Sequence, residues 1–90
     1  MRHAAHRDYA AGQRLAAMRE DRGLSRGDLV REMQLANPRN PRMHVSERTL
    51  MRIEDHGAVP TARVKFAVSA AFGLLPSQIW GCAARAGATR

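Results

Sequence analysis

The sequence is poor in cysteine and in aromatic residues: it has one Cys, two Phe, one Tyr and one Trp. Because Cys82 stands alone, no internal disulfide and no zinc site with several cysteine ligands can form. A single thiol also agrees with a reducing compartment. So few aromatic side chains do not provide the stacking platform on which proteins bind single-stranded nucleic acid. Disulfide-stapled domains, zinc fingers and single-strand binders are therefore disfavoured.

Long apolar runs are also missing. The longest run, from Phe66 to Leu75, is interrupted by Ser69 and Gly73 and is too short to span a bilayer. The first residues are charged and lack the apolar stretch of a secretory signal. No segment alternates apolar and polar residues as a half-buried strand would. We therefore expect a soluble, cytoplasmic, nucleoid-associated protein with an all-α fold.

Catalytic constellations are absent from the pattern as well. No Ser-His-Asp or Cys-His arrangement can be nominated, and no glycine-rich phosphate-binding loop appears. The four histidines are scattered through the arm and the loops, and His3 and His6 have no acidic or cysteine partner nearby for a metal ion. The sequence predicts a protein that is not an enzyme, with no metal and no cofactor.

What the sequence has in excess is arginine. Its formal net charge is +7, with fourteen Arg and one Lys against eight acids. This balance attracts polyanions such as nucleic acid, an acidic protein or an anionic membrane surface. Arginine binds phosphate and guanine in a bidentate manner, but a GC-rich genome also favours its codons, and we regard the second as the main cause of the bias. Neither explanation removes the charge.

Two helices are predicted in the first part of the chain. The first begins at the N-cap Asp8, ends at Gly23 and buries one stripe. That stripe consists of Ala11, Leu15, Met18 and the stem of Arg22. The second begins at the N-cap Ser25 with Asp28 at its third position. Its buried stripe consists of Leu29, Val30 and Met33, extended by Leu35.

Arg26 stands in the first turn of this second helix and is expected to be exposed. Its position near the amide-rich end of the helix suits a contact with a phosphate group. The alternative is an ordinary solvated arginine. Residues 36–44 then break the helical pattern, because Pro38 and Pro41 each follow an asparagine. Arg39, Arg42 and His44 make this loop basic.

The helix predicted at residues 46–55 is the most informative segment. Ser46 is its expected N-cap, and Val45, Leu50 and Ile53 fall on one side. Glu47, Arg48 and Arg52 fall on the opposite side. Such a polar face suits the DNA major groove, where Arg pairs with guanine O6 and N7 and Glu accepts from cytosine N4. The alternative is an amphipathic surface helix with a solvated polar face.

Two more helices complete the predicted domain. One runs from the N-cap Thr61 to Gly73, with a wide apolar face made of Val64, Ala67, Val68, Ala71 and Phe72. The other starts at Leu74–Ser77, where Pro76 sets the first turn, and carries Ile79 and Trp80. The sequence thus divides into a basic arm at 1–7, a helical domain at 8–81 and a fraying tail at 82–90. In the arm, Arg2 and Arg7 either reach DNA or belong to a disordered end, which we favour.

Several segments, taken together and in order, resemble the lambda-repressor-like helix-turn-helix family, which includes the Cro proteins, phage repressors and Xre-type regulators. They are Leu24-Ser25-Arg26-Gly27-Asp28-Leu29-Val30, Val45–Glu54, Gly57–Pro60 and Phe72–Ile79. The resemblance covers roughly residues 12–80. It implies a compact five-helix bundle in which the second and third helices form the DNA-reading unit.

The resemblance also implies roles for individual residues. The base-reading positions fall on Glu47, Arg48 and Arg52. The phosphate contacts fall on Arg26 and Thr49, and Glu54 matches an acid that serves structure within the bundle. We expect the N-cap Ser46 to contact a phosphate as well. These assignments describe a transcriptional regulator of double-stranded DNA, most simply a repressor.

Three features depart from the family pattern. The connection before the reading helix is about ten residues longer than the tight family turn, as in some actinobacterial or actinophage members. Arg39 and Arg42 in it either bind the DNA backbone or lie in solvent. The loop after the reading helix, Asp55–Val59, lacks the usual Lys or Arg. Lys65 occupies a position that is often apolar, so the phase of its helix is open.

Two questions about partners also stay open. An antitoxin or phage adaptor of the same fold would bind a protein through Leu75 and Trp80, which would then be partly exposed. Otherwise Trp80 packs in the core against the first helix. Family members commonly pair over two DNA half-sites about one helical turn apart, so a homodimer is possible, although a monomer is equally compatible.

Overall fold

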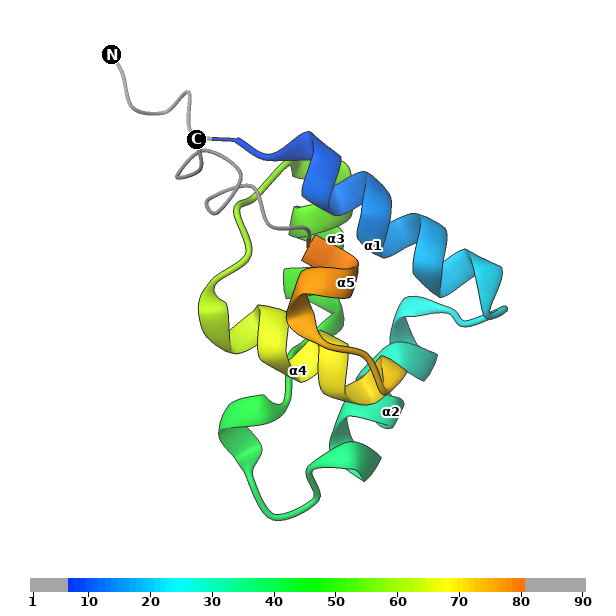
Figure 1. Ribbon diagram of the computed structural model, residues 1–90, viewed down its shortest axis with the longest axis vertical. Helices are drawn as coiled ribbons and strands as arrows, with labels where there is room; N and C mark the ends of the chain where they lie inside the picture. Colours follow the sequence, from blue (N-terminus) through cyan, green and yellow to red (C-terminus); the bar gives the residue numbers. More distant parts are fainter. Residues whose placement is uncertain (1–6, 81–90) are drawn as a thin grey trace.

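The computed structural model describes residues 7–80 and contains five α-helices and no strand in that range (Figure 1). The helices are α1 (Tyr9–Asp21), α2 (Arg26–Ala36), α3 (Glu47–His56), α4 (Ala62–Phe72) and α5 (Pro76–Trp80). One turn of 3-10 helix, η2 (Pro41–Met43), lies between α2 and α3. Helix α1 packs against α3 and α5, while α4 packs against α2 and α5. The predicted all-α, five-helix bundle is confirmed.

Each of the first four helices begins at a side chain that accepts a hydrogen bond from its own first turn. The predicted caps Asp8, Ser25, Ser46 and Thr61 all serve this role. At α2 the bond is reciprocal: Ser25 Oγ accepts from the amide of Asp28 at 3.0 Å, and Asp28 Oδ2 accepts from the amide of Ser25 at 2.9 Å. These caps satisfy amides that the helix itself leaves unpaired.

The helix ends follow from glycine. Gly57 and Gly73 cap α3 and α4 with φ of 71° and 70°, a left-handed conformation that side chains disfavour. Gly57 therefore ends α3 at the start of the short connection to α4, and Gly73 ends α4 before α5. Within this core the predicted apolar face of α4 is buried at Val64, Ala67, Val68 and Phe72, so its phase is the one expected.

The core is assembled from all five helices and from Val45, just before α3. Its remaining buried side chains are Ala11, Leu15, Leu29, Met33, Leu50, Ile53, Ile79 and Trp80. Trp80 is 6% exposed, and its indole Nε1 donates to the backbone oxygen of Lys65 at 3.1 Å, which ties α5 to α4. The core placement of Trp80 is therefore the one observed.

Two predictions about the buried stripes are wrong. Leu35 does not extend the stripe of α2 and is 66% exposed, because two residues of helix rotate it about 200° from Met33. Arg22, whose stem was expected to extend the stripe of α1, is exposed as well. Its guanidinium instead lies over the ring of Phe72, 4.7 Å from the centroid. The polar residue that is buried on α1 is Arg19.

Gly12 explains how closely two helices approach. A Cβ at this position would overlap the backbone oxygen of Ile53 on α3. The sequence suggests that Gly12 weakens the start of the helix, yet α1 begins at Tyr9 and runs through it. Its small size is used for packing α1 against α3, and this contact fixes α3 in the bundle.

The arm and the tail fall mostly outside the described residues. This applies to Arg2 and to the predicted tail at 82–90, whereas Arg7 is described and exposed. No helix within residues 7–80 combines the length and the apolar character needed to cross a bilayer.

Candidate nucleic-acid interface

Helix α3 is anchored by one side and presents the other to solvent. Leu50 is fully buried and Ile53 is 2% exposed, which fixes the inner face. Arg48 and Arg52 are exposed and follow each other at i and i+4. At about 100° per residue, they project nearly opposite the buried pair. The predicted outward position of both arginines is therefore observed, and no hydrogen bond or ion pair within residues 7–80 involves either guanidinium.

The first turn of α3 carries two hydroxyl groups. Ser46 Oγ accepts from the amide of Thr49 and donates to Thr49 Oγ1, both at 3.1 Å. Because Thr49 Oγ1 already accepts, its own proton is free to donate to an oxygen outside the protein. Ser46 is exposed and Thr49 half-buried. Both hydroxyls therefore lie at the positive end of the helix dipole, where anions are stabilised.

Glu47 is exposed but lies against the start of α2. Its Oε2 is 3.1 Å from the point that a Cβ on Gly27 would occupy. The absence of a side chain at Gly27 thus leaves room for the Glu47 carboxylate between the two helices. Sequence reasoning did not identify Gly27 as part of this surface, because its spacing to Glu47 is nonlocal.

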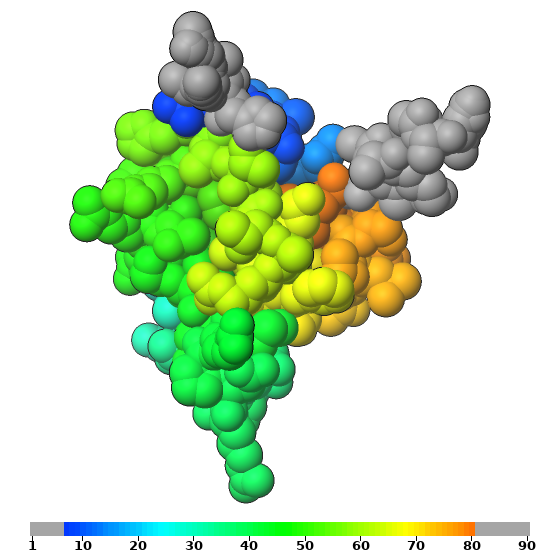
Figure 2. Space-filling view, turned by 90° about the vertical axis from the view of Figure 1, so that its left-hand side faces the viewer, coloured from blue at the N-terminus to red at the C-terminus, as the bar shows by residue number. Residues whose placement is uncertain are grey.

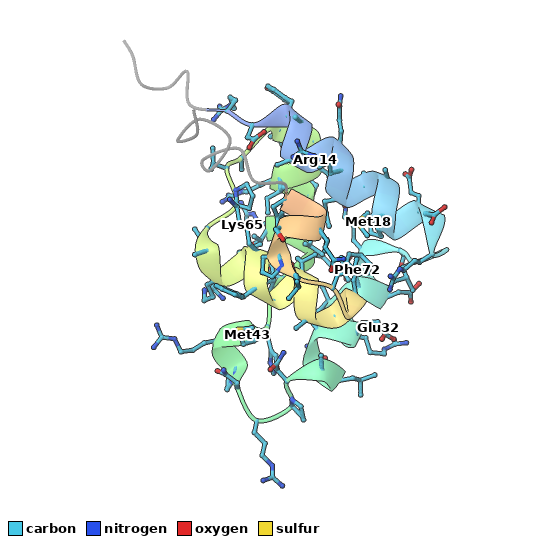
Figure 3. The ribbon with its side chains drawn as sticks, viewed as in Figure 1. Arg14, Met18, Glu32, Met43, Lys65 and Phe72 are labelled. Atoms are coloured by element: carbon cyan, nitrogen blue, oxygen red, sulfur yellow. The ribbon has the colours of Figure 1, made fainter. Side chains whose placement is uncertain are left out.

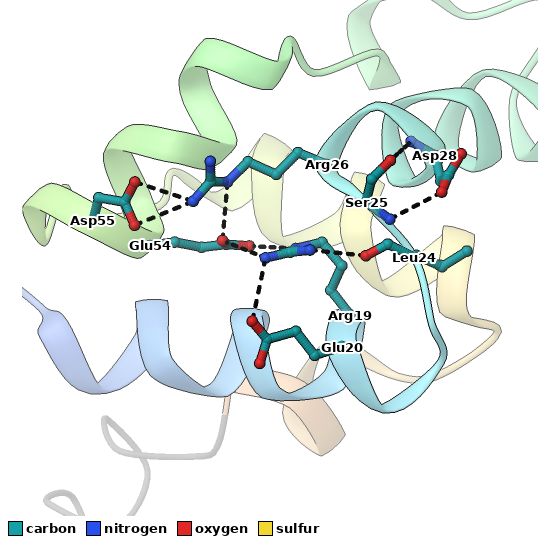
Figure 4. Close-up of polar contacts among 8 residues, drawn as sticks. All are labelled: Arg19, Glu20, Leu24, Ser25, Arg26, Asp28, Glu54 and Asp55. Carbon is teal, nitrogen blue, oxygen red and sulfur yellow. Dashed lines mark hydrogen bonds and ion pairs between the residues drawn. The ribbon is translucent and has the colours of Figure 1, made fainter.

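Arg26 does not have the exposure that the sequence suggested. Its side chain is 31% exposed and is held by two acids from α3 (Figure 4). Its Nε donates to Glu54 Oε1 at 3.0 Å, and its Nη2 reaches both oxygens of Asp55 at 3.1 and 3.0 Å. An isolated phosphate clamp was expected here. The guanidinium instead joins α2 to α3, because the chain brings two carboxylates within its reach.

Glu54 is the centre of this ion-pair network. Its side chain is 3% exposed, as expected for a structural acid, and Arg19 from α1 binds both of its oxygens at 2.9 Å. Arg19 Nη1 also donates to the backbone oxygen of Leu24 at 2.8 Å. The hydrogen bonds to Glu54 raise the pKa of Arg19 above its ordinary value, so the guanidinium stays charged. Three helices are thereby joined at one buried carboxylate.

Sequence reasoning missed Arg19, although a signal was available. Ala11, Leu15 and Arg19 are spaced four residues apart, so Arg19 continues the apolar stripe of α1. A charged residue in such a stripe requires a buried partner. Glu54, the residue after the buried Ile53, is that partner.

Arg39 and Arg42 lie in the connection between α2 and α3, which projects at the bottom of Figures 1 and 2. Both are exposed, and neither guanidinium has a hydrogen bond or ion pair within the described residues. From residue 37 to residue 53 the chain carries four arginines and one acid, a net charge of +3. Because Glu54 and Asp55 are neutralised by Arg19 and Arg26, this local positive charge is not cancelled at the end of α3.

The two residues predicted for a protein partner differ in exposure. Leu75 is 66% exposed, whereas Trp80 is buried in the core. The partly exposed Trp80 expected for that surface is therefore not observed. Among residues 7–80, no group of three His, Cys, Asp or Glu side chains is close enough to hold a metal ion.

Comparisons with protein-family models, with curated proteins and with solved structures find no match for this chain.

Proposed function

We propose that this protein is a sequence-specific double-stranded DNA-binding regulator that inserts α3 into the major groove. The observation that carries the proposal is the pair Arg48 and Arg52, exposed opposite the core and without a partner within residues 7–80. Other arginines nearby, Arg19 and Arg26, are occupied by Glu54 and Asp55. The outward pair is thus available to a ligand, on a helix that the bundle holds firmly.

The chemistry of this face matches the edges of base pairs. The major groove is about 12 Å wide and admits one α-helix. A guanidinium donates two parallel hydrogen bonds to guanine O6 and N7, which is the role proposed for Arg48 and Arg52. The Glu47 carboxylate accepts from cytosine N4.

The surroundings of α3 suit the DNA backbone. Ser46 and Thr49 are proposed to bind a phosphate at the start of the helix, where the hydroxyls and the helix dipole both favour an anion. In the connection before α3, Arg39 and Arg42 are each proposed to neutralise one phosphate. With about two phosphates neutralised per subunit, the log of the binding constant should fall with log salt with a slope of about −2.

In the cell, we propose that the protein acts in the cytoplasm on the nucleoid as a repressor of the lambda-repressor-like type. The order of the helices and the structural acid Glu54 support this proposal. One helix contacts only a few base pairs, so two copies on a two-fold operator would increase the length of the site. A selection from random duplexes tests whether two copies bind together. A dimer should select an inverted repeat, whereas a monomer should select a single half-site.

The test of base reading uses single substitutions on the selected duplex. Arg48→Ala and Arg52→Ala should each weaken binding by about 1–3 kcal/mol and relax the preference at one base pair. Arg31→Ala is the matched control, since Arg31 is exposed on α2 and its loss removes the same charge. The proposal is wrong if both α3 variants keep the wild-type sequence preference, or if the protein selects no duplex at all.

A further inference from the structure

The connection between α2 and α3 has its own internal structure. We name residues 37–44 the proline loop. Asn37 O accepts from the amide of Asn40 at 3.2 Å and from His44 Nε2 at 2.8 Å. Asn40 caps η2, with Oδ1 accepting from the amide of Arg42 at 3.3 Å and its backbone oxygen accepting from the amide of Met43 at 2.9 Å. The two ends of the loop are thus joined to each other across the turn.

The proline loop is also fastened to the bundle from outside. Arg63, in the first turn of α4, donates from Nη1 to the backbone oxygen of Arg42 at 2.7 Å. Met43 packs against the core from the loop side (Figure 3). A guanidinium on an exposed residue would ordinarily be left to solvent. Here it holds the backbone of the very residue whose own side chain points outward.

These contacts leave two side chains of the loop without a role inside the bundle. Arg39 and Arg42 are both exposed, and neither guanidinium is paired within residues 7–80. The backbone that carries them is ordered by hydrogen bonds before any ligand arrives. Binding a ligand to these two side chains therefore costs little additional conformational entropy of the loop backbone.

The short connection between Arg42 and α3 limits how far this arginine can lie from the proposed reading helix. Arg42 is four residues before Ser46, so their Cα atoms lie at most about 14 Å apart. This upper limit is comparable to the width of the major groove, about 12 Å, so Arg42 lies near the start of α3. With the start of α3 in the groove, Arg42 reaches the phosphates that border it, and Arg39 lies further out along the same loop. The space-filling view shows the loop projecting beyond the rest of the bundle (Figure 2).

We propose that the proline loop is a preorganised clamp for the DNA phosphate backbone, in which Arg39 and Arg42 bind phosphates and Arg63 is a positioning residue. This inference rests on the proposed function and extends it to one flank of the site read by α3. It assigns to Arg63, on a helix away from the reading surface, an effect on affinity through the backbone of Arg42. The contact is to phosphate, so it increases affinity equally on every base sequence.

The experiment measures the salt dependence of binding to the selected duplex. Arg39→Ala and Arg42→Ala should each reduce the log–log slope by about one, without changing the preferred sequence. Arg63→Ala should lower affinity more than the control Arg31→Ala, which removes the same charge elsewhere. Arg63→Lys should restore most of the loss, because an ammonium group can still donate to the Arg42 oxygen. Thermal unfolding of each variant checks that the bundle is intact.

Phosphate ethylation interference gives a second readout. In the wild-type complex, ethylation of phosphates on one side of the α3 site should weaken binding. In the double variant Arg39→Ala/Arg42→Ala, interference at those phosphates should disappear, while interference elsewhere should remain. The clamp is refuted if this double variant keeps the wild-type slope and interference pattern. The positioning role of Arg63 is refuted if Arg63→Ala and Arg31→Ala behave alike. In both cases the loss of base preference in Arg48→Ala and Arg52→Ala would still support the proposed function, so the two failures are distinguishable.

Discussion

Both carboxylate oxygens of Glu54 accept hydrogen bonds from Arg19 at 2.9 Å, although the two residues are 35 positions apart in the chain. Arg26 adds a third bond to Oε1 at 3.0 Å. A carboxylate that is 3% exposed needs such partners, because an unpaired buried charge is costly. The pairing therefore fixes the orientation of α3, on which the exposure of Arg48 and Arg52 depends.

Replacing Glu54 by Gln should destabilise the fold strongly. The substitution leaves the buried Arg19 with only the exposed Glu20, 3.9 Å away, as a counter-charge, and breaking a buried pair costs about 3–5 kcal/mol. This loss of stability is measured as the change in the free energy of unfolding from denaturant titration. Asp55→Asn is the control: Asp55 is 51% exposed on its side chain, so its loss should cost about 1 kcal/mol or less. Equal effects of the two substitutions would show that Glu54 does not hold the bundle.

The same Asp55→Asn variant should bind DNA more tightly. Asp55 lies on the outer side of α3, seven residues after Arg48 and therefore about 20° from its direction on the helical wheel. It also holds Arg26 through two hydrogen bonds. Removing its charge reduces repulsion of phosphate and releases Arg26, so affinity should rise by up to about fivefold at low salt. The gain should be the same on specific and random duplexes and should disappear at high salt. A gain confined to one base sequence would contradict this.

Local signals were sufficient to predict most of the fold. Asp8, Ser25, Ser46 and Thr61 cap helices because their side chains bond amides only three residues ahead, a property of the adjacent sequence. The outward direction of Arg48 followed from the helical period in the same way. The predicted DNA contacts of these exposed residues stay predictions.

The features that the sequence did not reveal are nonlocal. Arg26 was expected to be exposed at the start of its helix, but Glu54 and Asp55 approach it from 28 and 29 positions away in the chain. Gly12 was regarded as a weak point of α1, because nothing within α1 explains a glycine at this position. The backbone oxygen that requires it belongs to Ile53 on α3. Neither contact can be read from spacing within one helix. Both depend on how α1, α2 and α3 meet.

Gly12→Ala should destabilise the protein, although alanine is the better helix former. The propensity gain is about 1 kcal/mol, but the new methyl group would overlap the backbone oxygen of Ile53, which cannot move without shifting α3. Overpacking of this kind typically costs about 1–3 kcal/mol or more. Denaturant titration should therefore show a net loss of stability. A more stable Gly12→Ala variant would mean that α1 and α3 are not in close contact.

Gly27→Ala, unlike Gly12→Ala, should not destabilise the fold, and it should change the base preference of the protein at one position. Its new methyl group would lie 3.1 Å from Oε2 of the flexible Glu47 side chain and in ordinary contact with Ser25 Oγ at 3.8 Å. Stability should therefore be kept or rise by up to about 1 kcal/mol. The displaced carboxylate should alter the preference at the base pair that Glu47 reads, as measured by selection. Glu47→Ala should alter the same base pair. An effect of Gly27→Ala spread over the whole site would contradict the assignment.

The capping box of α2 should make stability depend on acid pH. Hydrogen bonds from the backbone amide and the hydroxyl of Ser25 hold the pKa of Asp28 below its usual 3.8. A carboxyl group with a lowered pKa stabilises the fold above its unfolded value, and this contribution is lost as the pH falls through the folded value. The unfolding temperature of the wild type should thus exceed that of Asp28→Asn at neutral pH.

The gap between these two proteins should close only below about pH 4, the unfolded pKa of an aspartate. Taking the difference between them cancels the titration of Glu54 and the other acids, which both proteins share. In a Ser25→Ala background, the difference in unfolding temperature between the protein with Asp28 and the Asp28→Asn variant should be smaller at neutral pH. The Ser25→Ala substitution removes the hydroxyl partner of Asp28, while the backbone amide of residue 25 remains. A gap that stays constant from neutral to strongly acidic pH would show that Asp28 stabilises α2 without its charge.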